Sequence, residues 1–271
     1  MINCPKISIV TVTYNSAATL EETILSVISQ DYKNLEYVII DGGSTDKTLD
    51  IVKKYKEQIA VVVSEPDKGI SDAFNKGIRK ASGEIVGIIN SDDILLPGAL
   101  TKIAEAYQPQ IDVYSGLMYC WDGKTHEKIL FYPDLTFDKL RLQYSVAHSS
   151  RFIRKDAYER YGMYQVDFRY MMDIDLLCRF YHRGATFQLV DAPLAQFRLG
   201  GVTNDSIYKK KEDYRLFVQN YGGSVWDFRK IWFQAVVKYH VIHLGYRLFG
   251  DDLRFKIQKH PLLKKIVSYF P

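Results

Sequence analysis

The sequence contains little cysteine and no long apolar run. Its three cysteines, Cys4, Cys120 and Cys178, are far apart and form no CxxC or Cys/His pattern, which disfavours both a disulfide framework and a zinc site. No uncharged apolar stretch approaches the roughly 20 residues that a membrane-spanning helix needs. The first residues enter a strand pattern without the segments of a signal peptide. We therefore expect a cytoplasmic protein that could contact a membrane only from its surface.

Two further absences exclude classes of function. The net charge is only +4 over 271 residues, and the first two hundred residues show no basic stripe interleaved with stacking aromatics, so nucleic acid is not an expected partner. The turn after the first predicted strand, TYNSAATL, has no glycine. This disfavours a dinucleotide dehydrogenase, which needs GxGxxG there, and a sugar nucleotidyltransferase, which needs a glycine-rich basic loop.

What is present, from residue 7 to about 107, is an alternation of short β-branched runs and amphipathic stretches. Strands are predicted at 7–13, 35–41, 60–65 and 84–90, and helices at 17–30, 46–58 and 70–82. Strands that alternate with helices form right-handed βαβ units. The fold class is therefore α/β, with a Rossmann-like, mostly parallel sheet flanked by helices.

The second part of the chain is less regular. Strands are predicted at 112–121, 126–133 and 186–190, a strand that runs into a helix at 149–162, and helices at 173–184 and 204–223. Residues 224–271 are aromatic, aliphatic and basic, and read as a C-terminal helical extension. The expected segments are 1–110, 111–223 and 224–271.

Polar motifs follow three of the predicted strands: TYN at 13–15, DGGSTD at 41–46 and NSDD at 90–93. In such sheets ligands bind beyond the carboxyl ends of the strands, so the three motifs should share one binding edge. Asp41 can accept a hydrogen bond from a nucleobase or a ribose hydroxyl. The plainer interpretation of residues 42–46 is a turn with good helix-capping residues.

Asp92 and Asp93 follow an apolar strand directly. Two adjacent carboxylates repel unless a cation or strong donors compensate them. Mn²⁺ or Mg²⁺, bound through one or two carboxylates and substrate phosphates, would do so. Alternatively, one of the two aspartates caps a helix that starts near Pro97.

Residues 6–110, with ISIVTVTYNSAATLEETILSVISQDYKNLEYVIIDGGSTDKT followed by EPDKGISDAFNKGIRKASGEIVGIINSDDILLPGAL, resemble family 2 glycosyltransferases of the GT-A fold. The resemblance continues more weakly to about residue 201. It implies a nucleotide-sugar donor, UDP-linked in the first instance, with GDP and dTDP as alternatives. It also implies roles for eight residues: the nucleoside at Thr11, Thr13, Tyr14 and Asp41, the diphosphate and sugar beside Lys68 and Asp72, and the cation at Asp92 together with Asp93. For Lys68 and Asp72 the alternative is a solvated helix terminus with a local charge pair.

The same resemblance places a general base at Asp173, before the DLLCR helix. Asp173 shares its helix side with Leu176, Leu177 and Phe180, whereas Asp175 should pair with Arg179 four residues on. Met172 departs from the family pattern, which often has an acidic residue there. The alternative for Asp173 is a carboxylate that answers the helix dipole.

Three further features carry weaker hypotheses. His148 could line the acceptor side, and Arg198 with Gly200 and Gly201 could form a closing loop over the diphosphate or an ordinary glycine turn. Residues 224–271 could lie on an anionic membrane surface, or pack on the catalytic domain or a second subunit.

Taken together, the sequence predicts an inverting, metal-dependent glycosyltransferase. It would act on a glycan or lipid-linked acceptor in bacterial polysaccharide or glycolipid assembly at the cytoplasmic membrane face. The rival outside catalysis is a nucleotide-sugar-binding or scaffold protein.

Overall fold

The computed structural model of the chain describes residues 4–121, 128–133, 148–198 and 210–221, together with positions 226, 229, 232, 233, 236, 237 and 240. The chain divides into two compact units. The first is made of Met1–Val166 and Met172–Gly200, and the second of Asp167–Met171 and Gly201–Pro271. The division into a nucleotide-sugar-binding half (1–110), an acceptor-binding half (111–223) and a C-terminal extension (224–271) stays a prediction.

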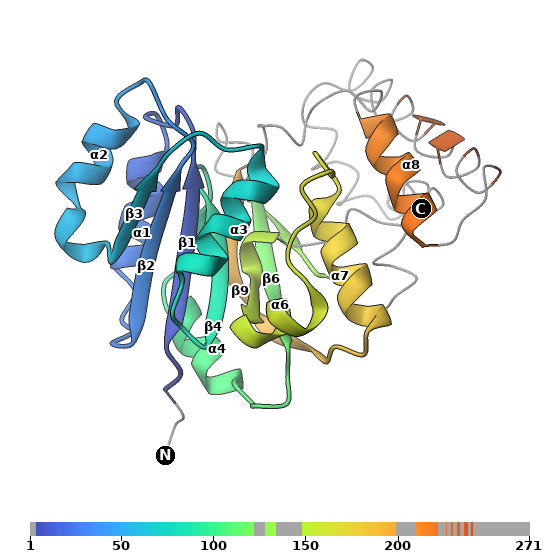
Figure 1. Cartoon of the computed structure of the whole chain (residues 1–271). Coiled ribbons are helices and arrows are strands. Elements are labelled where there is room, and N and C mark those ends of the chain that lie inside the picture. Colours follow the sequence, from blue (N-terminus) through green and yellow to red (C-terminus); the bar gives the residue numbers. More distant parts are fainter. Residues whose placement is uncertain are drawn as a thin grey trace. The chain divides into compact units, whose positions relative to one another are not determined.

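The first unit is built on one nine-stranded sheet (Figure 1). Its strands are β1 Ile7–Thr13, β2 Leu35–Asp41, β3 Val61–Ser64, β4 Ile85–Asn90, β5 Ile94–Leu95, β6 Val113–Trp121, β7 Lys128–Phe131, β8 Arg151–Arg154 and β9 Phe187–Arg198. They lie in the order β3-β2-β1-β4-β8-β6-β9-β5, and β7 pairs with β6. Strands β1 to β4 run parallel, as predicted, while β8 joins β4 in antiparallel fashion.

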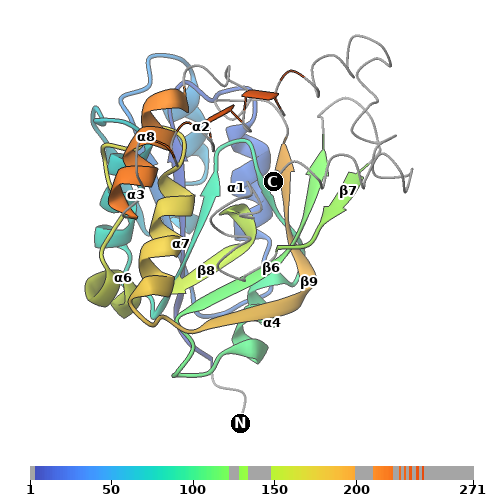
Figure 2. The same ribbon diagram turned by 90° about the vertical axis from the view of Figure 1, so that its right-hand side faces the viewer.

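Helices cover both faces of this sheet, and the two views agree that α3 and α7 lie on one face and α1 on the other (Figures 1 and 2). The helical elements of the first unit are α1 Leu20–Ile28, α2 Thr48–Lys54, η1 Lys56–Gln58, α3 Ile70–Lys80, α4 Ala99–Ala106, η2 His148–Ser150, α6 Lys155–Tyr161 and α7 Met172–His182. The predicted α/β class and its flanking helices are therefore confirmed.

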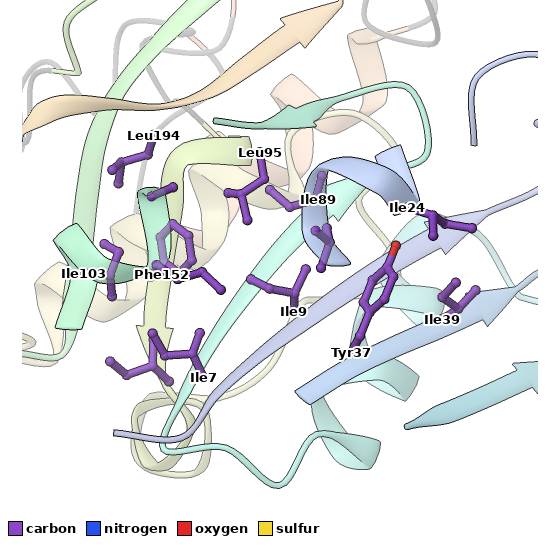
Figure 3. Packing of buried hydrophobic residues seen from close by; sticks show 14 of the residues in the cluster. Ile7, Ile9, Ile24, Tyr37, Ile39, Ile89, Leu95, Ile103, Phe152 and Leu194 are labelled. Carbon is purple, nitrogen blue, oxygen red and sulfur yellow. The ribbon is translucent and has the colours of Figure 1, made fainter. Parts of the chain in front are cut away.

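Alternation along β1 separates the two hydrophobic layers. Ile7 and Ile9 face α1 and α4, where they pack with Ile24, Ile89 and Phe152 in the cluster drawn in Figure 3. The even-numbered residues of the strand face α3. Because strands buried on both faces read as continuous β-branched runs, the sequence located β1 and β2 to the residue.

Helix α3 approaches β1 unusually closely at Gly77. A Cβ atom added to Gly77 would lie 2.2 Å from Cγ1 of Val10. We expect Gly77→Ala to lower the free energy of unfolding by about 1–3 kcal/mol through overpacking, despite the better helix propensity of alanine. Urea unfolding of the four proteins of a double-mutant cycle tests this, because Gly77→Ala should cost little in a Val10→Ala background. An equal cost in both backgrounds would contradict the contact.

At the amino ends of the strands, a buried carboxylate ties β1, β2 and the entry to β4 together. Glu36 accepts hydrogen bonds from Lys6 Nζ at 2.9 Å, from Ser8 Oγ at 2.5 Å, and from the backbone N–H and hydroxyl of Ser82 at 2.6 and 2.5 Å. Burial opposes ionisation, but these donors outweigh it and lower the pKa of Glu36 to about 2. The ionised form therefore stabilises the fold far from the polar edge.

This arrangement predicts a pH-dependent effect of Glu36→Gln. A depressed pKa contributes stability above the unfolded pKa, near 4.5, and loses it as pH falls toward 2. We expect Glu36→Gln to lower the free energy of unfolding by up to about 3 kcal/mol at pH 7, and the difference from the native chain to shrink between pH 4.5 and 3. Urea titrations at pH 7, 4 and 3 measure it. The exposed Glu57→Gln is the control, and a difference independent of pH would be contrary to the account.

The second unit holds α8 Lys211–Asn220. Buried Asp213 on this helix accepts the backbone N–H groups of Arg169, Tyr170 and Met171 at 3.0, 2.5 and 2.8 Å, which fixes the helix to residues 167–171. Most of the predicted extension at 224–271 lies outside the described residues. Among the helices that the structure describes, none is long and apolar enough to cross a bilayer.

Candidate active site

The three strand-end motifs do share one edge. In register, Thr13 of β1 lies beside Asp41 of β2, and Val12 lies beside Asn90 of β4. Parallel pairing places the carboxyl ends of these strands together. The loops that carry TYN, DGGSTD and NSDD therefore start side by side, as predicted.

Asp41 is fully buried, and its carboxylate organises its own loop. It accepts the N–H groups of Gly43 and Ser44 at 3.2 and 3.0 Å and the hydroxyls of Ser44 and Ser64 at 2.5 and 2.6 Å. An aspartate that bonds to the backbone two and three residues on forms an Asx-type turn. A direct bond from Asp41 to a nucleoside stays a prediction.

The chain packs closely at Gly42, which leaves no room for a larger side chain. A Cβ atom at Gly42 would lie 2.9 Å from Asp67 Oδ2 and 3.4 Å from Cδ2 of Tyr14. The Tyr14 side chain is 63% exposed, so its ring is available to a ligand. An exposed aromatic ring near a carboxylate suits a planar base with hydrogen-bond donors.

Asn15 stabilises the loop after β1, a role that the sequence analysis did not predict. Its φ of 48° is left-handed, and its Oδ1 accepts the N–H of Thr45 at 2.9 Å while its own N–H donates to Ser44 Oγ at 2.8 Å. Asparagine tolerates this conformation better than most residues. An asparagine directly after a strand end was the available signal.

The two threonines of β1 differ. The hydroxyl of Thr11 is buried and lies 3.0 Å from the hydroxyl of Tyr37, inside the core. Thr13, at the edge, has a buried Oγ1 without a partner among the described residues. Thr13 is therefore the better placed to meet a ligand, and a nucleoside contact of Thr11 stays a prediction.

The loop before α3 is fixed by a lysine that sequence reasoning missed. Lys76 Nζ contacts Asp67 at 2.7 Å, Glu65 at 3.0 Å and Asp72 at 3.7 Å. Asp67 and then Glu65 raise the pKa of Lys76, which stays charged. Asp72 also accepts the backbone N–H of Lys68 at 3.1 Å. Asp72 thus shapes this loop, and the exposed Lys68 side chain extends from it.

Asp93 is fully buried and held by the protein. Its Oδ2 accepts the hydroxyl of Ser149 at 2.5 Å, and its Oδ1 accepts the N–H of Arg198 at 3.1 Å. Burial, and then the charge of Asp92, raise the pKa of Asp93 to about 7. Arg198 also donates from Nε to the Asp92 carbonyl at 3.3 Å and lies 4.6 Å from the Trp121 ring.

Asp92 is only partly buried, and in the described part of the chain no other residue donates a hydrogen bond to its carboxylate. Burial raises its pKa as well. Neither aspartate caps a helix: β5 intervenes, and α4 begins after Gly98 with no side-chain cap. The capping alternative is wrong, because residues 94–95 pair with β9 instead.

The pair fits a divalent cation. Two adjacent carboxylates with raised pKa values carry the charge that a cation would compensate, and Asp92 has unused oxygens. No group of three or more His, Cys, Asp or Glu side chains in the described ranges is arranged to hold a metal. An ion here would complete its shell with phosphate oxygens and water, which Mg²⁺ and Mn²⁺ commonly do.

Asp173 lies in the first turn of α7, among buried apolar neighbours, with 24% of its side chain exposed. Its Oδ1 lies 3.0 Å from His148 Nδ1 and 4.0 Å from Arg151 NH1. Burial opposes ionisation, but the pKa of Asp173 is lowered by His148, Arg151 and the Tyr164 hydroxyl. Asp175 instead pairs with Arg179 at 2.8 Å, as predicted.

Two consecutive residues of η2 join the two carboxylate sites. His148 contacts Asp173, and Ser149 donates to Asp93. The His148 ring also stacks on Phe74 of α3, with ring centroids 5.0 Å apart. The side-chain amide of Asn75 on α3 donates to the Tyr164 carbonyl at 2.8 Å and accepts the Tyr164 N–H at 3.0 Å. The fold thus brings Asp92, Asp93 and Asp173 into one arrangement, of which Ser149, Tyr164 and Arg151 were not foreseen.

Comparison with known sequences identifies the family. A profile described as glycosyl transferase family 2 matches residues 8–162, more than half of the chain. The chain belongs to glycosyl transferase family 2. Its relatives include TuaG of Bacillus subtilis, a putative teichuronic acid biosynthesis glycosyltransferase, which is 29% identical over 76% of this chain and 83% of its own length. A PGL/p-HBAD biosynthesis glycosyltransferase of Mycobacterium tuberculosis is 27% identical over 76% and 82%.

Other relatives are longer. Uncharacterized glycosyltransferases of Rickettsia typhi and of Nostoc, 28% and 34% identical, match 65% and 51% of this chain but only 58% and 41% of their own lengths. Among solved structures, Staphylococcus aureus TarS 1–349 in complex with UDP-GlcNAc has a TM-score of 0.63 at 20% identity, over 92% of this chain and 75% of that one. The mannosyltransferase PcManGT of Pyrobaculum calidifontis, in complex with GDP-Man and Mn²⁺, scores 0.57 at 17% identity, over 98% and 79%.

These neighbours confirm the GT-A fold of this family 2 chain. In chemical terms, the described site offers an exposed aromatic ring at Tyr14 and two aspartates suited to a diphosphate-bound cation. It also offers an ionised carboxylate at Asp173. That combination can bind a nucleoside diphosphate sugar and accept a proton from a hydroxyl.

Proposed function

We propose that this family 2 glycosyltransferase inverts the anomeric centre as it moves a sugar from a nucleoside diphosphate, UDP in the first instance, to an acceptor hydroxyl. The observation that carries the proposal is the position of Asp173, a half-buried carboxylate with a lowered pKa: it contacts His148, and the next residue, Ser149, donates to Asp93. An ionised carboxylate in that position can take the proton of an attacking hydroxyl. Direct displacement from the opposite face of the sugar would invert the centre.

The residues would divide the work as follows. Tyr14 would hold the base, with Thr13 and Asp41 beside the nucleoside, and Lys68 would neutralise phosphate charge. Asp92, supported by Asp93, would hold Mn²⁺ or Mg²⁺, which when bound would favour departure of the diphosphate. Asp173 would orient and deprotonate the acceptor, and this positioning should supply much of the rate acceleration.

The relatives named for teichuronic acid and PGL/p-HBAD biosynthesis support a glycan or lipid-linked acceptor in cell-envelope assembly. A peripheral membrane contact or homo-oligomer contact through 224–271 belongs to the same proposal. Of this segment, Trp226 and Phe233 are 74% and 69% exposed, and Arg229 lies over the Trp226 ring at 5.0 Å. Such residues suit an anionic lipid surface.

The test is turnover of UDP-, GDP- and dTDP-sugars in the presence of a bacterial lipid extract, with the anomeric configuration of the product read by NMR. Transfer with inverted configuration would support the proposal. Retained configuration would exclude direct displacement. Tight nucleotide-sugar binding without transfer or hydrolysis would favour the scaffold alternative.

A further inference from the structure

The guanidinium of Arg151, the first residue of β8, makes no hydrogen bond within the described part of the chain. Its side chain is only 3% exposed, and its Nε, NH1 and NH2 atoms are buried without a hydrogen-bond partner among the described residues. A guanidinium has five donors in a fixed fork, and burying it without hydrogen bonds is costly. An apolar side chain of similar length would serve β8 about as well.

Within ion-pairing distance, the described carboxylate that faces Arg151 is Asp173, with NH1 4.0 Å from Oδ1. His148 Nδ1 lies 3.0 Å from the same oxygen. Both ion pairs that the described residues give Asp173 therefore end on Oδ1, and the Tyr164 hydroxyl also hydrogen-bonds to this carboxylate. This leaves Oδ2 as the oxygen without a cationic contact.

We propose that Arg151 is a positioning residue: together with His148 it fixes Oδ1 of Asp173, so that Oδ2 is the oxygen that receives the proton of the acceptor hydroxyl. The inference rests on the proposed function of Asp173 as the base. Arg151 acts through Asp173 and does not touch the substrate. Its permanent charge keeps the partly exposed carboxylate ionised and oriented in surroundings that would otherwise favour the neutral form.

Other titratable groups face Asp173 from each neighbouring element. His148 approaches from η2, Tyr158 from α6, and Tyr164 from the loop after α6. Burial raises the pKa of both tyrosines, so both are neutral near pH 7. On α7 itself, Asp175 is paired with Arg179. Asp93, in the NSDD motif, accepts a hydrogen bond from Ser149, the residue after His148. Arg151 is thus the permanent positive charge that faces this carboxylate within the described ranges.

The test compares Arg151→Met, Arg151→Lys and, as a matched control on the same strand, Arg154→Met. The titration of Asp173 is followed by ¹³C NMR of the full chain with ¹³C-labelled aspartate, assigned with Asp173→Asn. Arg151→Met should raise the pKa of Asp173 by about one unit or more. In Arg151→Lys, which keeps the positive charge, the pKa should stay close to the native value, and Arg154→Met should leave it unchanged. The melting temperature of Arg151→Met should fall only modestly near pH 7, since the variant loses the ion pair with Asp173 but no longer buries a guanidinium without hydrogen bonds.

Where the native chain transfers sugar, the acidic limb of the kcat profile should move to higher pH by the same amount in Arg151→Met. An unchanged Asp173 titration would overturn the inference. So would a large fall in melting temperature with activity reduced equally at every pH, which indicates a structural role. A native chain that transfers nothing would refute the proposed function, whereas transfer together with an unmoved acidic limb would refute the role of Arg151 alone.

Discussion

Asp173→Asn is expected to lower the rate of sugar transfer by a factor of about 10²–10⁴, the range for loss of a general base. The substitution keeps the size of the side chain and an acceptor oxygen for His148, but it removes the charge and the proton-accepting oxygen. Because the described contacts of Asp173 are with His148, Arg151 and Tyr164 and not with the strand-end motifs themselves, binding of the nucleotide donor should be unchanged. The measurement is kcat together with donor affinity for both proteins.

Asp50→Asn is the matched control, since Asp50 is a largely exposed aspartate on α2 that pairs only with Lys53 within the described structure. It should leave both quantities unchanged. A transfer rate for Asp173→Asn within a few-fold of the native rate would show that another group takes the proton. An equal loss of donor affinity and of rate would assign Asp173 to binding.

Asp92→Asn is expected to weaken metal-dependent binding of a nucleoside diphosphate by about 100-fold, equivalent to about 2.8 kcal/mol. Asp92 is the aspartate whose carboxylate is not occupied by described neighbours, so its loss removes a ligand without breaking a structural bond. In Asp93→Asn, by contrast, the hydrogen bonds to Ser149 and Arg198 are disturbed. That variant should lose about 1–3 kcal/mol of stability as well.

Without metal, the substitutions Asp92→Asn and Asp93→Asn should also change the stability of the fold in opposite directions. Because the pKa of Asp93 is raised to about 7, the native fold binds the proton better than the unfolded chain does. Its stability should therefore fall as pH rises from about 4 to about 7. Asp92→Asn removes the repulsion and should flatten this fall, so in EDTA the variant should melt above the native chain at pH 8. Melting curves at pH 5 and pH 8 decide it, and an unchanged pH dependence would speak against the coupling.

Local patterns located the elements whose burial is uniform along the chain. Strands β1 and β2 end where the β-branched runs end, at Thr13 and Asp41, and those ends define the binding edge. Strand β5 was missed because it has only two residues and exists through its pairing with Gln196 and Ala195 of β9, about a hundred positions away. Its neighbour Pro97 suggested a helix start instead.

Contacts between residues far apart in the sequence also limited the prediction of the site. A sequence pattern could nominate Asp93 and Asp173, but the serine and histidine that contact them lie 56 and 25 residues away. It could not show that the carboxylate of Asp41 serves its own loop, although Asp followed by Gly-Gly-Ser is typical of such turns. The contact between Lys76 and Asp72, four residues apart on one helix, was the detail most open to prediction.

The central claim is that the carboxyl edge of β1, β2 and β4 binds a nucleoside diphosphate through a cation. The most direct measurement is a calorimetric titration of the native chain with UDP, GDP and dTDP, once in Mn²⁺ and once in EDTA. The account predicts that at least one of the three binds in Mn²⁺ and that its binding is lost, or weakened about 100-fold, in EDTA. Equal binding in both buffers, or none to any nucleotide, would contradict it.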